Sequence, residues 1–331
     1  MQLVIVMEND AGQRFDKFLH KCLPKAPSGF LYKMLRKKNI TLNNKKAEGR
    51  EILTLFDEVR FFLSDDTYEK FSGVSDRTFT DYEKAYRQLK GVQIIYEDRD
   101  ILILNKPADM LSQKAEISDL SLNEWLIGYM LSKKNYTEEQ LTRFKPSVCN
   151  RLDRNTTGLV LAGKTLSGLQ FLSGLLKLRG VRKYYRLFVK GQITKESLIE
   201  GYLVKNQTSN KVSILQESPN EEGEKASYIQ TAYRPVRIME DKTLLEVELI
   251  TGKTHQIRAH LSSIGHPLIG DYKYGDRKLN EQYKKTFGTE SQLLHAYRLV
   301  FPMLSGDYIH LSGKEFIAPL PEIFETICNQ D

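Results

Sequence analysis

The feature that most constrains the fold is a run of four consecutive aliphatic residues, Ile101 to Leu104, with polar chain on both sides. A short unbroken apolar run indicates a strand that is buried on both faces of a sheet. After this run, strand-like and helix-like segments follow one another without the βαβ rhythm of a doubly wound parallel sheet. The sequence therefore predicts a fold of the α+β class.

The chain of 331 residues is too long for one small domain, and its composition suggests where it divides. Residues 1–64 are predicted to form a compact unit. Residues 65–91 are polar with few aliphatic side chains, so we predict a linker there, with a short helix near Asp81 to Leu89. Residues 92–331 are then the larger domain.

Within the N-terminal unit, a helical pattern is followed by an alternating one. Apolar residues recur at helical spacing from Phe15 to Cys22, which predicts a helix. A second helix follows, with Ser28 as its predicted N-cap. Ile40 and Leu42 then alternate into an Asn-Asn turn, which is typical of a hairpin.

Three cations of the second predicted helix, Lys33, Arg36 and Lys37, fall on one face. A charge run of this kind is commonly a solvated helix surface. Here no acidic residue balances the face and Tyr32 lies beside it, so we predict that the three cations bind a substrate polyanion. The formal net charge of +7 is modest but agrees with such a partner.

The cysteines, Cys22, Cys149 and Cys328, are too few and too far apart for a disulfide framework or a CxxC metal site. This usage is typical of a reducing cytoplasm. The first ten residues lack the pattern of a signal peptide, and no apolar run approaches the roughly 20 residues that cross a bilayer. We therefore expect a cytoplasmic protein that is not bound to a membrane.

Residues 150–158, Asn-Arg-Leu-Asp-Arg-Asn-Thr-Thr-Gly, are unusually polar and lead directly into an apolar strand. In extended chain, Arg151 and Asp153 project to the same side. An aspartate between two arginines is often only an ion pair or a turn cap. The other charged segments of the chain favour a catalytic carboxylate at Asp153.

Residues 251–261 follow an alternating strand and predict a helix that Thr254 caps. Lys253, His255 and Arg258 gather at its N-terminal end, where the helix dipole is already positive. Cations at this end cost stability, so a purely structural interpretation is weak. The arrangement suits a phosphate or a carboxylate instead. His255 and Arg258 are three residues apart and share a face.

Metal and thiol chemistry are not favoured. His255 and His260 are five residues apart, which misses the spacing of a zinc-binding helix, and no HExxH motif is present. Cys149 has no histidine near it in the sequence, and a small buried residue is the simpler interpretation.

The segment from Arg182 to Gly191 predicts a strand. A period of two places Tyr185 with Leu187 and Val189 on the inward face. A core tyrosine is the ordinary interpretation. At the edge of a cleft, the same ring could stack on a nucleic-acid base.

The charged segments together resemble the RluA-type family of RNA pseudouridine synthases. Residues 150–158 resemble the family's His-Arg-Leu-Asp-x-x-Thr-Ser-Gly motif, and residues 183–191 resemble its Lys-x-Tyr-x-Ala-x-Val-x-Gly strand. Residues 251–261 resemble its Thr-Gly-Arg-Thr-His-Gln-Ile-Arg-Val-His-Leu helix. Further matches, in family order, lie at residues 105–107, 265–271, 293–296 and 316–321.

The resemblance implies a fold and a set of partners. It implies a mixed, largely antiparallel sheet with flanking helices and a central cleft. Residues 12–62 resemble the small alpha-L RNA-binding domain that precedes the catalytic domain in many members. Such a domain is usual in members that modify large-subunit ribosomal RNA, so this RNA is the expected partner, with transfer RNA as the alternative. A monomer is the default expectation.

The resemblance also implies roles for single residues. Asp153 would be the catalytic aspartate, Tyr185 the tyrosine packed on the target base, and Arg258 the arginine paired with the aspartate. Arg151 would help to fill the space that the flipped uridine leaves, and Lys106 would lie near the active-site cleft.

Two positions depart from the family pattern. Asn150 stands where histidine is usual, so this side chain can form hydrogen bonds but cannot titrate. Lys253 stands where arginine is usual, which keeps the charge and loses the bidentate fork. Both Lys253 and His255 are expected to bind substrate.

The implied reaction moves the bond between ribose and base from a ring nitrogen to carbon five of the same base. Nothing is oxidised or consumed, so no cofactor or metal is expected. Arg258 would orient Asp153, which would act as a nucleophile at the sugar or as a base. Two rival functions are a non-catalytic RNA-binding or ribosome-assembly protein, and a hydrolase with a second acid, although no such acid stands out.

Overall fold

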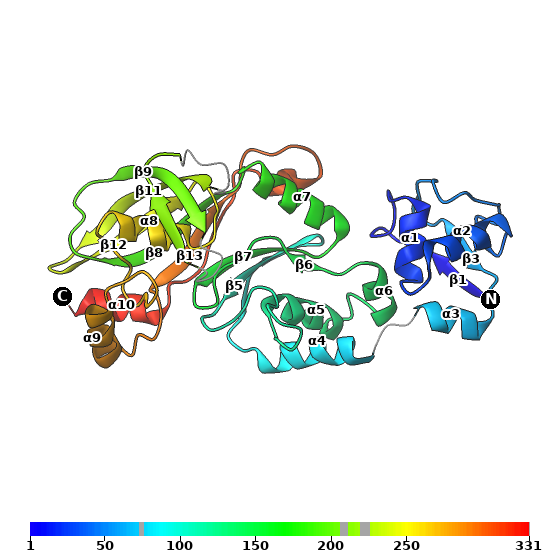
Figure 1. Cartoon of the computed structure of the whole chain (residues 1–331), viewed down its shortest axis with the longest axis horizontal. Helices are drawn as coiled ribbons and strands as arrows, with labels where there is room; N and C mark the ends of the chain where they lie inside the picture. The colour runs from blue at the N-terminus through cyan, green and yellow to red at the C-terminus, as the bar shows by residue number, and fades with distance from the viewer. Residues whose placement is uncertain (73–75, 206–210, 219–225, 331) are drawn as a thin grey trace.

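The computed structural model describes residues 1–72, 76–205, 211–218 and 226–330. It shows a small N-terminal unit beside a larger domain that is built on one long sheet (Figure 1). In these parts of the chain, no helix combines the length and the apolar character needed to cross a membrane.

The N-terminal unit is a three-stranded antiparallel sheet, in the order β1-β3-β2, packed against helices. Its elements are β1 (Gln2–Ile5), α1 (Phe15–Cys22), α2 (Ser28–Arg36), β2 (Ile40–Leu42), β3 (Glu58–Phe61) and α3 (Asp65–Ser72). The core of the unit contains Phe15 and Phe18 of α1 and Leu35 of α2. Both predicted helices and the predicted strand are confirmed.

In the N-terminal unit, one predicted detail is wrong and another is confirmed. The N-cap of α2 is Pro27, and Ser28 is the first helical residue, so the predicted Ser28 cap is wrong. The proline fixes the extended entry into the helix instead. The predicted hairpin-like turn at Asn43 is confirmed, with a left-handed φ of 50° and an antiparallel bridge between Leu42 and Lys45 across it, and β2 also pairs with the later strand β3.

The predicted polar linker contains two helices, α3 and α4 (Asp76–Gln88). The short helix expected near Asp81 is confirmed as part of α4, while α3 was not predicted. Tyr82 of α4 packs against α5 (Leu122–Ser132) so closely that a Cβ on Gly128 would lie 2.2 Å from the Tyr82 carbonyl oxygen. Tyr82 and the small Ala85 are buried on the described part of this helix, so an aromatic ring and close contacts replace the large aliphatic residues that the sequence lacks there.

Among the residues that the structure describes, eleven strands form the large sheet, in the order β10-β9-β11-β12-β8-β13-β7-β5-β4, with β14 beside β13 and β6 beside β7. Their bounds are β4 (Gln93–Glu97), β5 (Ile101–Lys106), β6 (Ser147–Val148), β7 (Thr157–Gly163), β8 (Arg182–Lys190), β9 (Ser197–Lys205), β10 (Val212–Leu215), β11 (Ala226–Ile238), β12 (Lys242–Leu249), β13 (Leu294–Val300) and β14 (Glu315–Ile317). Of these strand pairs, β13 with β7 is parallel and the others are antiparallel. The predicted α+β class with a mixed, largely antiparallel sheet is confirmed.

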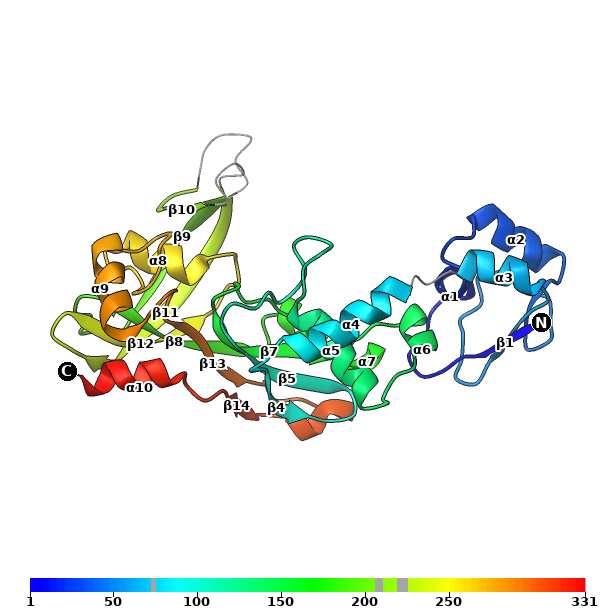
Figure 2. The same ribbon diagram turned by 90° about the horizontal axis from the view of Figure 1, so that it is seen from below.

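Helices flank the sheet on both sides (Figure 2). The remaining ones are α6 (Glu138–Arg143), α7 (Leu166–Lys177), α8 (Gln256–Ser263), α9 (Arg277–Phe287), the 3-10 helix η1 (Gly306–Leu311) and α10 (Glu322–Asn329). Strand β5 shows the effect of the two-sided cover. Its Leu102 and Leu104 belong to one hydrophobic cluster, and its Ile101 and Ile103 belong to another. The prediction of a strand buried on both faces is therefore confirmed.

Polar contacts join the N-terminal unit to the larger domain. Asn9 Nδ2 donates a hydrogen bond of 2.6 Å to the Tyr136 hydroxyl, and Asn9 Oδ1 accepts one of 2.9 Å from the Leu166 amide. Arg143 and Asp10 form a buried ion pair at 3.2 Å. Breaking a buried ion pair is costly, so these contacts hold the two units in one arrangement.

Candidate active site

Asp153 lies on the loop between β6 and β7, and backbone contacts hold this loop from both sides. The Leu152 amide donates to Ser112 Oγ, and Ser112 Oγ donates to the Leu152 carbonyl oxygen, both at 2.9 Å. Asn150 Oδ1 accepts a hydrogen bond of 2.7 Å from the Leu161 amide of β7. Leu152 is buried while Arg151 is exposed, so the loop turns its charged side outward. Asn150 therefore has a structural role, and this role does not require a side chain that gains or loses a proton.

Lys106 lies beneath the Asp153 loop and is fully buried, with 0% of the residue exposed. Its Nζ donates hydrogen bonds to the carbonyl oxygens of Pro107, Met110 and Arg154, at 2.8 to 2.9 Å. Burial lowers the pKa of Lys106 to about 7. The Lys106 amino group thus faces backbone rather than solvent, and the binding of substrate by Lys106 stays a prediction. Lys106 supports the loop from below.

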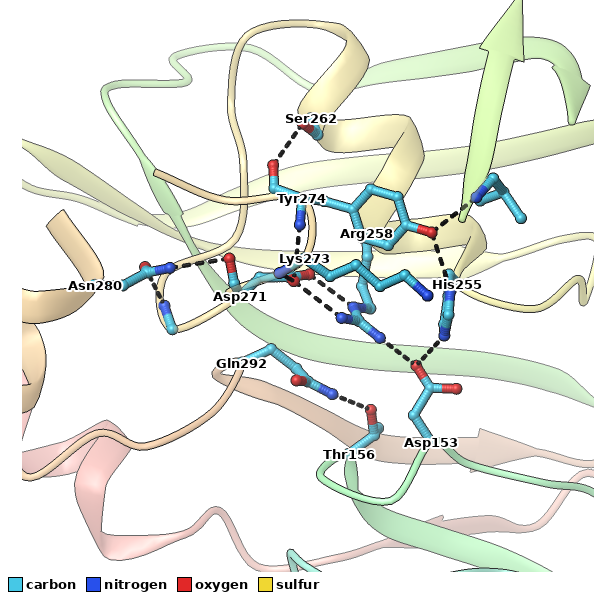
Figure 3. Close-up of polar contacts among 12 residues, drawn as sticks. Asp153, Thr156, His255, Arg258, Ser262, Asp271, Lys273, Tyr274, Asn280 and Gln292 are labelled. Carbon is cyan, nitrogen blue, oxygen red and sulfur yellow. Dashed lines mark hydrogen bonds and ion pairs between the residues drawn. The ribbon is translucent and has the colours of Figure 1, made fainter. Parts of the chain in front are cut away.

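Arg258 of α8 connects Asp153 to a second carboxylate (Figure 3). Arg258 Nη1 donates a hydrogen bond of 2.8 Å to Asp153 Oδ2. On the other edge of the guanidinium, Nε and Nη2 donate to the two oxygens of Asp271, at 2.7 and 2.9 Å. The predicted pairing of Asp153 with Arg258 is therefore present, and the fork that faces Asp271 fixes the orientation of the arginine.

Asp271 is a structural anchor. It is fully buried, and its Oδ1 also accepts hydrogen bonds from the amides of Lys273 and Tyr274, at 2.8 and 3.1 Å. Burial acts to raise the pKa of Asp271, but the hydrogen bonds and the charge of Arg258 outweigh it, and the pKa is lowered. Asp271 is thus held as a carboxylate at neutral pH.

The start of α8 differs from the prediction. The N-cap is His255, in a left-handed conformation with φ of 56°, and not Thr254, which is exposed. No side chain caps this helix; instead, Gln256 Oε1 ties the preceding turn to the helix by accepting hydrogen bonds from the Lys253 amide and the Thr251 hydroxyl, at 3.1 and 2.9 Å. The turn at His255 directs its ring towards Asp153 (Figure 3).

His255 approaches the same oxygen as Arg258. Its Nε2 is 3.7 Å from Asp153 Oδ2, and its Nδ1 is 3.0 Å from the Tyr274 hydroxyl. Burial lowers the pKa of His255, partly opposed by the charge of Asp153. The shared helix face predicted for His255 and Arg258 is therefore used, and both side chains meet Asp153. Lys253, next to this turn, is exposed.

Tyr185 lies on β8, opposite Val247 of β12 and Ala296 of β13. It belongs to the same hydrophobic cluster as Leu187 and Val189, as the period of two predicted, and only 6% of it is exposed. Burial and the charge of Asp153 raise its pKa, so the phenol stays neutral. Tyr185 is close enough to Asp153 to sense its charge.

The cations of α2 lie apart from this site. Lys33, Arg36 and Lys37 are exposed on the N-terminal unit, at the opposite end of the molecule from α8 (Figure 1). They do not join the Asp153 cluster. Burial raises the pKa of the Cys149 thiol to about 11, which disfavours a nucleophilic role for that residue.

Three supporting residues were not assigned a role from the sequence. They are Ser112, Asp271 and Tyr274. Asp271 ends the matched segment 265–271, so the signal was present there, but no spacing rule connects it to Arg258. No pattern in the sequence points to Ser112 or Tyr274.

Comparison with known proteins identifies the family of this chain. Residues 100–263 match the family model described as RNA pseudouridylate synthase. Ribosomal large subunit pseudouridine synthase C of Vibrio cholerae is 32% identical over 302 residues, which cover 91% of this chain and 89% of that protein. The protein of the same name from Vibrio parahaemolyticus is 31% identical over 328 residues, covering 99% and 95%.

Among solved structures, human RNA Pseudouridylate Synthase Domain Containing 4 is similar in fold, with a TM-score of 0.58 at 22% identity. The match covers 76% of this chain and 97% of that one.

Fold and site together define an RNA-modifying isomerase that converts uridine to pseudouridine. The chain belongs to the RNA pseudouridylate synthase family and is of the RluA type.

Proposed function

We propose that this enzyme isomerises specific uridines of large-subunit ribosomal RNA, with Asp153 as the reacting group. The observation that supports this most strongly is that the two oxygens of the Asp153 carboxylate have different contacts. Arg258 and His255 both approach Oδ2, and within the described parts of the chain no hydrogen bond reaches Oδ1. Since 29% of the side chain is exposed, one oxygen is fixed and the other is accessible.

The accessible oxygen suits either of the two open mechanisms. In the reaction, the bond from the ribose anomeric carbon to N1 breaks and a bond to C5 forms, while a proton leaves C5 and N1 gains one. Asp153 Oδ1 can attack the sugar as a nucleophile or remove a sugar proton as a base. Both routes need an oriented carboxylate, and Arg258 supplies that orientation.

The target base must first leave the RNA stack, which costs a few kcal/mol. We propose that stacking on Tyr185 offsets part of this cost, at about 1–3 kcal/mol per base. Arg151 and Lys253 are exposed beside the site and are proposed to contact the RNA, with Arg151 filling the space of the flipped uridine. Lys33, Arg36 and Lys37 are proposed to contact a more distant RNA segment.

The choice of ribosomal RNA rests on two observations. The relatives at 32% and 31% identity are named for the large ribosomal subunit and match over most of the chain. The N-terminal unit also presents an exposed cationic helix face. The proposal includes a cytoplasmic monomer. It needs no cofactor, because the isomerisation consumes no second reactant.

Pseudouridine mapping in a strain that lacks the gene tests the substrate. We expect individual pseudouridines to disappear from large-subunit ribosomal RNA and to return when the wild-type gene is restored. Loss confined to transfer RNA would replace the proposed substrate with the alternative. An unchanged modification map would support a non-catalytic RNA-binding protein.

A further inference from the structure

The Tyr274 hydroxyl lies between the backbone of strand β10 and the ring of His255. The Val212 amide donates a hydrogen bond of 3.0 Å to this hydroxyl oxygen. The same oxygen is 3.0 Å from His255 Nδ1, and the two rings meet edge to face with centroids 5.6 Å apart. These contacts form a continuous path from β10 to the Asp153 carboxylate (Figure 3).

The direction of these hydrogen bonds follows from the number of protons. A tyrosine hydroxyl has one proton to donate, and the Val212 amide already occupies one of its lone pairs. The Tyr274 proton is then available for His255 Nδ1. In a neutral imidazole, a nitrogen that accepts leaves the proton on the other one. His255 Nε2 therefore carries the proton and faces Asp153.

The carboxylate favours the same tautomer. His255 Nε2 lies 3.7 Å from Asp153 Oδ2, which is longer than a hydrogen bond, so the orientation of the dipole decides the interaction. An N–H group directs its positive end at the carboxylate, whereas a bare nitrogen would direct a lone pair at it. Because the His255 side chain is only 12% exposed, water screens this difference weakly.

We propose that Tyr274 and His255 are positioning residues: Tyr274 orients the His255 ring, and His255 approaches Asp153 Oδ2 from the side that Arg258 leaves open, so that Oδ1 faces the target uridine. The inference rests on the proposed role of Asp153. Figure 3 shows Arg258 and His255 approaching the carboxylate from two sides. The Tyr274 ring also lies 5.3 Å from the Arg258 guanidinium carbon, so one side chain supports both groups that contact Oδ2.

The ring and the hydroxyl of Tyr274 can be tested separately. Tyr274→Phe keeps the ring beside Arg258 and removes only the oxygen. Tyr272→Phe is the matched control, because Tyr272 is on the same loop and is 48% exposed. We expect kcat to fall about 10- to 100-fold in Tyr274→Phe with KM unchanged, as for loss of a group that orients an active-site side chain. Tyr272→Phe should match the wild type.

A pair of substitutions at His255 tests the donor itself. A glutamine amide can place an N–H group near the position of Nε2, whereas alanine cannot. We expect His255→Gln to keep much more of the wild-type kcat than His255→Ala. A purely structural role would not favour glutamine in this way.

Nitrogen-15 NMR of histidine-labelled protein reads the tautomer directly and does not depend on activity. The signals of His255 are assigned by their absence in His255→Gln. We expect the Nε2–H tautomer in the wild type and a shift towards Nδ1–H in Tyr274→Phe. An Nδ1–H tautomer in the wild type, or wild-type kcat in Tyr274→Phe, would overturn the inference. If the wild type isomerised no RNA, the proposed function would be wrong. The tautomer of His255 would still show whether the hydrogen bond between Tyr274 and His255 runs in the inferred direction.

Discussion

The two carboxylates that contact Arg258 lie on different loops and in different surroundings. Asp271 is fully buried, binds Arg258 through both oxygens and also accepts two backbone amides. Asp153 is 29% exposed and meets Arg258 through Oδ2 alone. Arg258 therefore binds one carboxylate through both of its oxygens and the other carboxylate through a single oxygen.

This difference shows how a buried ion pair can serve a reactive group. The Asp271 pair fixes the guanidinium where water cannot compete, and the remaining Arg258 Nη1 then orients Asp153. Substitutions on the two sides of Arg258 should therefore have unlike consequences, in stability on the Asp271 side and in chemistry on the Asp153 side.

The largest effect on stability is expected at Asp271. Asp271→Asn keeps the shape of the side chain but removes the charge opposite the buried Arg258. Breaking one partner of a buried pair costs ~3–5 kcal/mol. We expect the free energy of unfolding in urea to fall by that order, while Asp153→Asn changes it by less than about 1 kcal/mol because its partly exposed pair is screened. Equal losses at both positions would contradict the division between anchor and reactive group.

The next effect is expected at Arg258 itself. Arg258→Lys keeps one positive charge but cannot contact both carboxylates, because an ammonium group has no planar fork. We expect kcat to fall about 100-fold, which corresponds to ~2.7 kcal/mol in activation free energy. Single-turnover kinetics measure this. Near-normal kcat in this variant would show that orientation by the fork is unimportant.

A smaller, pH-dependent effect is expected at Lys106. Its pKa of about 7 in the folded protein lies below the value of ~10.4 in an unfolded chain. Between these values the unfolded state binds more protons, so stability rises with pH. Relative to Lys106→Met, the free energy of unfolding of the wild type should rise by up to ~1.4 kcal/mol per pH unit above pH 7. Below pH 7 the amino group is charged in both the folded and the unfolded state, so the full cost of burying the charge should remain. Urea unfolding at pH 7 and pH 9 measures the difference, and a flat difference would show that Lys106 stays charged.

The smallest effect per residue is expected on the cationic face of α2. Replacing Lys33, Arg36 and Lys37 with alanine should weaken RNA binding. It should also lower the slope of log affinity against log salt by about one for each phosphate that the helix no longer neutralises. The kcat at saturating RNA should not change.

The matched control for α2 removes one arginine and two lysines from α9, which is the same change in charge. Arg277, Lys278 and Lys285 are also exposed, and their replacement by alanine should leave the salt slope near that of the wild type. Equal slopes for the two triple variants would show that only net charge matters.

Elements with a strong local pattern could be predicted from the sequence. The run from Ile101 predicted a doubly buried strand, and the spacing of apolar residues predicted α1. Helix α3 was missed because its segment has few aliphatic residues. The left-handed turn at His255 was missed because Thr254 is the better cap by residue type, whereas no side chain caps the helix and Gln256 holds the preceding turn instead.

The sequence predicted the charged pair at the site but not the residues that support this pair. Asp153 and Arg258 could be paired because both lie in matched segments. The roles of Asp271 and Lys106 could not be predicted, because each depends on burial, and a lysine is rarely buried without a charged partner. Three backbone carbonyl oxygens receive the Lys106 amino group, and no sequence pattern indicates that arrangement.

Tritium release from RNA labelled at position five of uracil tests the central claim most directly, since forming the new carbon bond frees that hydrogen. We expect the wild type to release tritium and Asp153→Asn to release none, although both bind the RNA with nearly equal affinity. Release at the wild-type rate by Asp153→Asn would show that the accessible oxygen of Asp153 is not the reacting group.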